Sequence, residues 1–245
     1  MGKSPFSSLF IKSLLGLMLF LSPLCLMAQE ENVDVASKSK HWKVGILGGY
    51  DQNYHIVDMN YMSDIKYDKY TSGMTYGLQF GYSPVKWFSL RLDAVMVQKN
   101  YHVDHVFQYY NLFYSLPSTT TNQYINVPLV AMLNVGRLVK LHLFGGGYGG
   151  YWLKSHRKGT TYSFSNERYY EYDVDVVFND KRDNRLEYGF TWGAGVSSTI
   201  KDRLELGAEV RWYYSVTDIQ KPYMTNLNPR YNTTFVIQGG IAFWL

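Results

Sequence analysis

Eight segments of the sequence alternate strictly between two kinds of side chain. In residues 203–215, RLELGAEVRWYYS, one parity carries charged residues and glycine while the other carries leucine, alanine, valine and tryptophan. Successive side chains of a β-strand point to opposite faces, so this period predicts strands with two chemically different faces. The predicted strands are residues 42–51, 74–83, 87–101, 123–134, 140–153, 188–199, 203–216 and 232–245.

The connections between these strands alternate between long and short. Brief turns follow the second, fourth and sixth strands, and contain Pro84, Gly136 and residues 200–202. Long polar stretches follow the other strands, at residues 52–73, 102–122, 154–187 and 217–231. Long external loops and short periplasmic turns are typical of outer-membrane barrels. The predicted fold is therefore all-β, an eight-stranded antiparallel transmembrane β-barrel in the outer membrane, with both termini in the periplasm.

The first residues predict that the chain is exported. Lys3 and Lys12 precede an apolar run that ends at Ala28, which is the layout of a secretory signal peptide. We expect cleavage between Ala28 and Gln29. The predicted division of the chain is a signal peptide at 1–28, a periplasmic N-terminal linker at 29–41 and an outer-membrane β-barrel at 42–245.

Cys25, the only cysteine, falls inside the predicted signal peptide, so the mature chain would contain no disulfide. The alternative, a lipid attached to Cys25, is disfavoured because Leu24 stands where a lipoprotein signal needs a small residue. No later apolar run approaches the ~20 residues of a membrane-spanning helix. A mature chain within a membrane would thus have to be a closed barrel, which satisfies the backbone groups of every strand.

The two faces of the strands differ in bulk as well as in polarity. An eight-stranded barrel has an interior only wide enough for side chains to fill it, and small and charged residues suit such an interior better than leucines do. We therefore expect the apolar face to contact outer-membrane lipid and the charged face to line a plugged polar lumen. Enclosed charges of mixed sign must be paired. The predicted lumen charge cluster is Arg91, Asp93, Arg203, Glu205, Glu209 and Arg211.

Aromatic residues near the strand ends predict two belts at the level of the lipid headgroups. The periplasmic belt would contain Trp42, Tyr82, Trp87 and Trp244. The outer belt would contain Tyr50, Tyr76, Tyr101, Tyr151, Tyr188 and Tyr214.

Residues able to support catalysis or metal binding are sparse. His102 and His105 stand three apart on an extended segment and would not share a face, which favours a solvated loop over a metal site. His142 has inward parity and no serine partner on its face, which favours a histidine packed in the lumen. Asp173 and Asp175 share one side of an extended segment, but the glycine-bearing spacing of a calcium loop is absent. We expect no enzyme activity, cofactor or resident metal.

Nucleic acid is not an expected partner. The formal net charge of +4 falls to about +2 once Lys3 and Lys12 leave with the signal peptide, and this is not the charge of a nucleic-acid-binding domain.

Several segments of the chain resemble the PorT-like outer-membrane β-barrel proteins, a porin family of Gram-negative bacteria. The most family-like detail is the opening of the fourth strand, YINVPL, where Pro128 lacks a ladder donor and suggests a bulge. The segments that carry the resemblance are GILGGY at 45–50, YGLQFGYSPVKWFSLRLDAVMVQKNY at 76–101, YINVPLVAMLNV at 124–135, FGGGYGGYWL at 144–153, YGFTWGAGV at 188–196 and LELGAEVRWYYSVTDI at 204–219. The resemblance implies a barrel and supplies no catalytic residues.

Three functions remain open from the sequence, and the last of them is an enzyme at the barrel rim that acts on lipid or peptide. The first is a non-enzymatic barrel that holds external binding loops, chiefly 154–187, for an unidentified external ligand, since loops on a rigid scaffold are where binding usually occurs. The alternative, which the resemblance implies, is an accessory component of protein secretion or transport across the outer membrane. Its partners would be envelope or secretion proteins that contact the periplasmic turns and residues 29–41.

Overall fold

The computed structural model describes residues 41–57, 65–67, 71–109, 112–137, 139–200, 203–221 and 230–245. The predicted signal peptide and nearly all of the predicted linker lie outside these residues. In the described part of the chain the regular structure is all β, with eleven strands in antiparallel pairs. Within these same residues there is no helix with the length and hydropathy of a membrane span.

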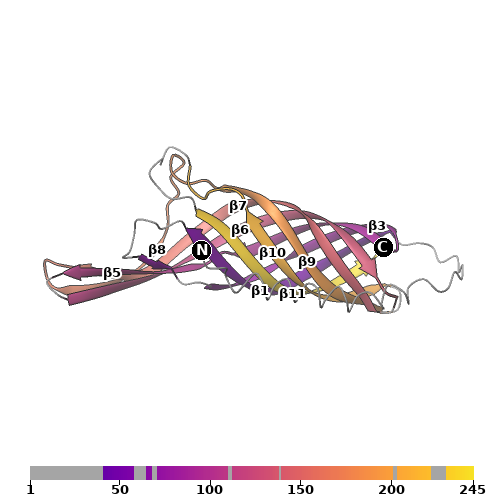
Figure 1. The fold of residues 1–245 in the computed structure, drawn as a ribbon, viewed down its shortest axis with the longest axis horizontal. Helices are drawn as coiled ribbons and strands as arrows, with labels where there is room; N and C mark the ends of the chain where they lie inside the picture. Colours follow the sequence, from indigo (N-terminus) through magenta and orange to yellow (C-terminus); the bar gives the residue numbers. More distant parts are fainter. Residues whose placement is uncertain are drawn as a thin grey trace, which may run out of the picture.

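Eight of the strands form a closed ring (Figure 1). Each strand pairs with the next one along the chain, and the last pairs with the first, so no strand of the ring has an unpaired edge. This is the predicted eight-stranded antiparallel barrel. Its strands are β1 (Trp42–Val57), β3 (Thr71–Val85), β4 (Phe88–Gln98), β6 (Leu112–Val135), β7 (Val139–Ser163), β9 (Leu186–Ile200), β10 (Leu204–Ser215) and β11 (Arg230–Trp244).

The two faces of the barrel wall differ as the alternation predicts. On β6, Leu129 is 57% exposed, whereas its neighbour Val130 is 1% exposed. The outward parity of the ring forms a belt of bulky apolar residues, called the apolar belt below. It includes Ile46, Leu78, Leu90, Leu92, Ile125, Val127, Leu129, Leu133, Leu143, Val196, Leu206, Ile237 and Ile241, each more than one-third exposed. The inward parity carries polar, charged and small residues.

The short turns and the two described termini gather at one end of the ring, called the turn end below. The backbone N–H of Leu245 donates to the carbonyl oxygen of Trp42 at 2.9 Å, and that of Ser83 donates to His41 at 2.7 Å. Gly136, in the turn between β6 and β7, has a φ of 111°, and a Cβ there would lie 2.2 Å from the carbonyl oxygen of Val139. A residue with a side chain would be strained at this position.

A second sheet projects from the opposite end of the ring (Figure 1). Strands β6 and β7 contain 24 and 25 residues, far more than the ~10 that span a membrane. Beyond the barrel, residues 118–123 of β6 stay paired with residues 154–159 of β7. Strand β5 (Tyr101–Tyr109) pairs with β6 there, and β8 (Arg168–Asp175) pairs with β7. The short strand β2 (Ile65–Tyr67) pairs with β5, and these three strands together with residues 112–123 and 154–163 form the projecting sheet.

The projecting sheet corrects the prediction that 102–122 and 154–187 are external loops, because most of both segments is strand. Two features explain the continuation. The Ser-Thr-Thr-Thr run at 118–121 has β-favouring residues, and β7 supplies a paired partner opposite it. The ladder shifts register between Gln123 and Tyr124, where Leu153 is the extra residue on β7. This bulge separates the barrel from the projecting sheet and reverses the parity of β7.

The chemistry of the outer face changes at the same bulge. Below it, Ile125 and Tyr151 belong to the apolar face, whereas the next outward pair above it is Gln123 and Lys154. A polar outer face cannot lie in hydrocarbon without a cost in free energy, so the apolar belt ends at this level.

Pro128 does not form the expected bulge. The register of β4 with β6 is the same on both sides of it, with Leu92 opposite Leu129 and Val95 opposite Asn126. Pairing is interrupted between these two points because proline has no N–H to donate to the ladder.

Candidate functional site

A layer of charged side chains crosses the middle of the barrel. Arg91 on β4 forms a bidentate ion pair with Glu209 on β10, with Nη1–Oε2 and Nη2–Oε1 distances of 2.8 Å each. Gln238 donates a further hydrogen bond to Glu209 Oε1 at 2.6 Å. Three strands separate β4 from β10 on either side of the ring, so this pair spans the full width of the lumen.

Asp93 and Arg211 complete this central layer. Arg211 Nη2 lies 2.8 Å from Asp93 Oδ2 and 2.9 Å from Glu209 Oε1, and Arg91 Nε lies 3.2 Å from Asp93 Oδ2. The ring of Phe144 packs against both guanidinium groups, at 5.1 and 5.0 Å from its centroid. Asp93 and Arg211 are fully buried, so each charge depends on these partners rather than on bulk water.

A second charged layer lies toward the turn end. Lys43 Nζ is 2.6 Å from Glu205 Oε1, and the indole N–H of Trp244 donates to Glu205 Oε2 at 3.0 Å. The Lys43 ammonium also lies 5.2 Å from the centroid of the Trp244 ring, which is within cation–π range.

A third layer lies toward the projecting sheet. The ammonium group of Lys99 pairs with Glu187, which also accepts hydrogen bonds from Tyr148 and Asn232 at 2.8 Å each. The Tyr124 and Tyr148 rings lie 4.6 and 5.4 Å from Lys99 Nζ. Lys99 is fully buried, and its charge is therefore held between a carboxylate and two aromatic faces.

These layers contain five of the six side chains of the predicted lumen cluster. Arg203 lies elsewhere: β10 begins only at Leu204, so Arg203 stands in the turn with an exposed side chain. Sequence reasoning missed Lys43, Lys99 and Glu187. Lys43 and Lys99 have the inward parity of their predicted strands, so the same pattern could have identified them. Glu187 stands one residue before the predicted strand at 188–199.

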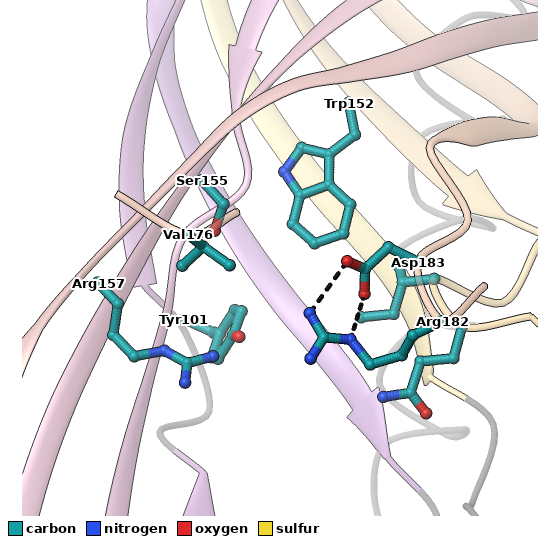
Figure 2. Close-up of a pocket in the computed structure, with 9 residues that line it drawn as sticks. Tyr101, Trp152, Ser155, Arg157, Val176, Arg182 and Asp183 are labelled. Atoms are coloured by element: carbon teal, nitrogen blue, oxygen red, sulfur yellow. Dashed lines mark hydrogen bonds and ion pairs between the residues drawn. The ribbon is translucent and has the colours of Figure 1, made fainter. Parts of the chain in front are cut away.

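A cavity of about 250 Å³ lies at the mouth of the barrel, where the ring meets the projecting sheet, and Figure 2 shows the residues that line it. Trp152 stacks on Tyr124 with a centroid separation of 5.7 Å and an interplanar angle of 5°, which separates the cavity from the layer below. The cavity, called the mouth pocket below, is lined by Tyr101, Trp152, Ser155, Arg157, Val176, Arg182, Asp183, Ile219 and Gln220. Tyr101 therefore does not belong to the outer aromatic belt. It has the inward parity of Arg91 and Lys99, because the pairing with β6 keeps one register from Gln98 opposite Gln123 to Tyr101 opposite Thr120.

The wall of the mouth pocket that carries Arg182 is held by Asp183. The Asp183 carboxylate accepts hydrogen bonds from Arg182 Nε at 2.7 Å, from Arg182 Nη2 at 3.0 Å and from the backbone N–H of Asn179 at 2.8 Å. Burial opposes ionisation of this carboxylate, but these hydrogen bonds outweigh it and keep the pKa of Asp183 below its usual value. Backbone hydrogen bonds from Asn184 to Ile219 and from Lys221 to Arg182 tie the same wall to the segment after β10.

His156 bridges two aspartates on the projecting sheet. Its Nδ1 lies 2.8 Å from Asp175 Oδ1 and its Nε2 lies 2.6 Å from Asp173 Oδ1, and Lys154 Nζ lies 3.2 Å from Asp175. The hydrogen bond with Asp175, supported by Asp173, raises the pKa of His156, and the bonds from His156 and Lys154 lower the pKa of Asp175. Asp173 and Asp175 thus share a face, as the sequence predicts, and face a histidine.

The chain matches the family model described as "Outer membrane protein beta-barrel domain" over residues 27–221. The chain belongs to this outer-membrane β-barrel family. Among solved structures, it is similar to Neisserial surface protein A, with 10% identity, a TM-score of 0.45 and coverage of 83% of this chain and 97% of that one. It is also similar to OprG of Pseudomonas aeruginosa, with 14% identity, a TM-score of 0.44 and coverage of 84% and 98%. A third similar structure is Ail of Yersinia pestis, with 17% identity, a TM-score of 0.39 and coverage of 83% and 99%. No curated protein sequence matches the chain.

On this outer-membrane β-barrel, exposed aromatic residues gather at the tip of the β7–β8 hairpin. Tyr162 contacts Phe164 and Tyr169, with ring centroids 5.1 and 4.9 Å apart. Phe164 and Tyr169 are 52% and 54% exposed. Glu167, in the turn between the two strands, has a φ of 53°. The rings of Tyr162, Phe164 and Tyr169 are called the tip cluster below.

His102, His105 and His142, the histidines considered in the sequence analysis, do not form one site. His102 is bonded to Thr119 Oγ1 at 2.8 Å, and His105 lies on the opposite face of β5. His142 is buried in the lumen, with Nε2 3.7 Å from Glu209 Oε2. Among the described residues, no group of three or more histidine, cysteine, aspartate or glutamate side chains has the geometry of a metal site.

Proposed function

We propose that this outer-membrane barrel is a non-enzymatic scaffold with a closed lumen, and that its projecting sheet presents a binding surface outside the cell. The observation that carries the proposal is the tip cluster. Its exposed aromatic rings sit at the end of a hairpin raised well beyond the apolar belt. Clustered exposed aromatic surface typically marks an interaction site, and aromatic side chains dominate the binding energy of many interfaces.

The charged layers support the closed lumen. Three layers of paired side chains lie at successive levels of an eight-stranded ring, with ion pairs that reach across the lumen between β4 and β10. Displacing such pairs to admit a solute would leave buried charges without partners. We expect no conductance steps when the purified barrel is inserted into a planar lipid bilayer. Reproducible steps would contradict a closed lumen.

The orientation of the barrel is part of the proposal. The turn end, with both described termini, faces the periplasm, and the projecting sheet faces the medium. The support is the pattern of long and short connections, which in outer-membrane barrels places the long ones outside.

A screen of the intact protein in lipid nanodiscs tests the binding surface. Immobilised cell-surface proteins and glycans would serve as the panel, and the test variant would carry Phe164→Ser and Tyr169→Ser. We expect a partner whose binding falls at least tenfold with this variant. The control is Val177→Ser. It removes an apolar side chain that is 86% exposed and does not belong to the tip cluster. Binding that is equal for wild type and the tip variant would contradict the proposal.

A role in protein secretion is the second candidate, and its support is the resemblance of the segments around 76–101 and 124–135 to PorT-like proteins. A deletion strain separates the two functions. Accumulation of exported cargo in the periplasm would favour secretion, whereas an unchanged set of secreted proteins would leave the external binding surface as the function.

A further inference from the structure

The mouth pocket holds two guanidinium groups on opposite walls. Arg157 extends from the inward face of β7 above the bulge, and Arg182 extends from the connection between β8 and β9. Figure 2 shows both groups pointing toward the middle of the pocket. Among the described residues that line the pocket, Asp183 is the only acidic one, so two positive charges face one negative charge there.

The guanidinium group of Arg157 uses few of its N–H donors within the described residues. Its Nε donates a long hydrogen bond to Thr120 Oγ1 at 3.4 Å. Within the described part of the chain, its two terminal amino groups have no hydrogen bond or ion pair. A planar guanidinium group with unused donors matches the geometry of a carboxylate or phosphate.

Arg182 is held in place by Asp183. The two hydrogen bonds from Arg182 to Asp183, and the third from Asn179 to the same carboxylate, set the position of this guanidinium group. The acceptor capacity of Asp183 is directed at these donors, so the carboxylate is poorly placed to hold an incoming cation. An anion placed between the two arginines would instead reduce their mutual repulsion.

The remainder of the pocket is suited to a ring. Trp152 and Tyr101 contribute aromatic surface, and Val176 and Ile219 contribute aliphatic surface. Trp152 is held against Tyr124 and against Phe178, with ring centroids 5.7 and 4.9 Å apart. A rigid aromatic wall loses little conformational entropy when a ligand packs against it.

We propose that the mouth pocket binds a small organic anion, with a phosphate or carboxylate head between Arg157 and Arg182 and a ring against Trp152 and Tyr101. The cavity of about 250 Å³ has room for a single ring with its acidic group. The pocket faces the lumen mouth rather than the apolar belt, so the ligand enters from the aqueous side. This inference rests on the proposed function, because it supplies a ligand class for the same external end of the scaffold.

Isothermal titration calorimetry on the full-length barrel, folded in an uncharged detergent, tests the site. The probes are phenyl phosphate, inorganic phosphate and benzyl alcohol. We expect phenyl phosphate to bind most tightly, inorganic phosphate at least tenfold more weakly and benzyl alcohol not measurably. Equal binding of benzyl alcohol and phenyl phosphate would overturn the role of the arginines.

Two variants of neighbouring residues give a matched comparison. Arg157→Gln should weaken phenyl phosphate binding at least tenfold, whereas Lys158→Gln, the same change of charge on the opposite face of β7, should leave it unchanged. Heat-dependent mobility in gels establishes that each variant is folded. The proposal is wrong if the folded wild-type barrel binds none of the probes. It is also wrong if Arg157→Gln binds phenyl phosphate as tightly as the wild type does. The scaffold proposal would survive that result, because its test is the tip-cluster variant.

Discussion

Arg91 and Glu209 join diametrically opposite strands of the barrel through two parallel hydrogen bonds of 2.8 Å. The two residues are 118 positions apart in the chain, yet each supplies the main partner of the other. Their pair, with Asp93 and Arg211, fills the middle of the lumen with charges that stabilise one another. We therefore expect the stability of the barrel to depend on these contacts.

Removal of the central carboxylate should destabilise the barrel strongly. In Glu209→Gln, Arg91 and Arg211 would share Asp93 as their remaining carboxylate partner, and breaking a buried pair costs about 3–5 kcal/mol. Urea unfolding in lipid vesicles measures the loss. The control is Arg203→Gln at the exposed turn arginine, which should change the free energy of unfolding by no more than about 0.5 kcal/mol. Equal effects of the two substitutions would contradict the lumen assignment.

An arginine substitution on the apolar belt should lower the free energy of unfolding more, the closer the position lies to the middle of the membrane. Leu129 stands at the centre of the outward stripe of β6, which runs from Ile125 to Leu133, so Leu129→Arg should destabilise the barrel by about 2–4 kcal/mol. Leu206 lies nearer the end of its stripe on β10, and Leu206→Arg should cost less. Gln123→Arg, above the belt, should be nearly neutral. Unfolding titrations in lipid vesicles measure the free energy of unfolding of each variant. Similar values for all three variants would contradict the placement of the belt.

The His156 bridge should make the β7–β8 hairpin sensitive to pH. The pKa of His156 is raised above 6.5, so its stabilisation is fully present below that value and is lost as the pH rises through the folded pKa. The pKa of Asp175 is lowered below 3.8, so its contribution is present above that value and is lost as the pH falls through the folded pKa. The hairpin should therefore be most stable between about pH 4 and 6.5.

An NMR titration of His156 measures the shift directly. We expect a His156 pKa above 6.5 in the wild type and a lower pKa in Asp175→Asn. Glu171→Gln is the control, because it removes one carboxylate from the same face of β8 at a position opposite Thr160 rather than His156. A His156 pKa that is the same in all three proteins would exclude the bridge.

Protease access should report the orientation. Lys181, in the connection between β8 and β9, and Arg137, in the turn between β6 and β7, are both exposed and lie at opposite ends of the barrel. Trypsin added to intact cells should cleave at Lys181, whereas cleavage at Arg137 should require permeabilised cells. Mass spectrometry of the fragments identifies the sites. The reverse pattern would place the projecting sheet in the periplasm.

The barrel itself was predictable from local patterns. Alternation in segments such as 203–216 indicates which side chains share a face, and the alternating loop lengths indicate an antiparallel ring. The projecting sheet was harder to predict, because Ser-Thr-rich segments such as 118–121 are equally typical of polar loops. They are strands here because β6 and β7 remain paired beyond the barrel. The mouth pocket was not predictable, since Tyr101 begins β5, Arg157 lies on β7 and Asp183 lies in the connection between β8 and β9, and only the fold brings them together.

The sequence by itself determined the two faces of the wall, because the chemistry of a strand face depends only on residues that alternate locally. Parity also placed Arg91, Asp93, Glu209 and Arg211 on the inward face. Only the tertiary structure decided which charges meet, because ring closure sets which strands lie opposite and a single bulge at Leu153 reverses the parity above it. Arg203 illustrates the difference: it has the right parity, but β10 begins one residue later, and the side chain lies outside the lumen.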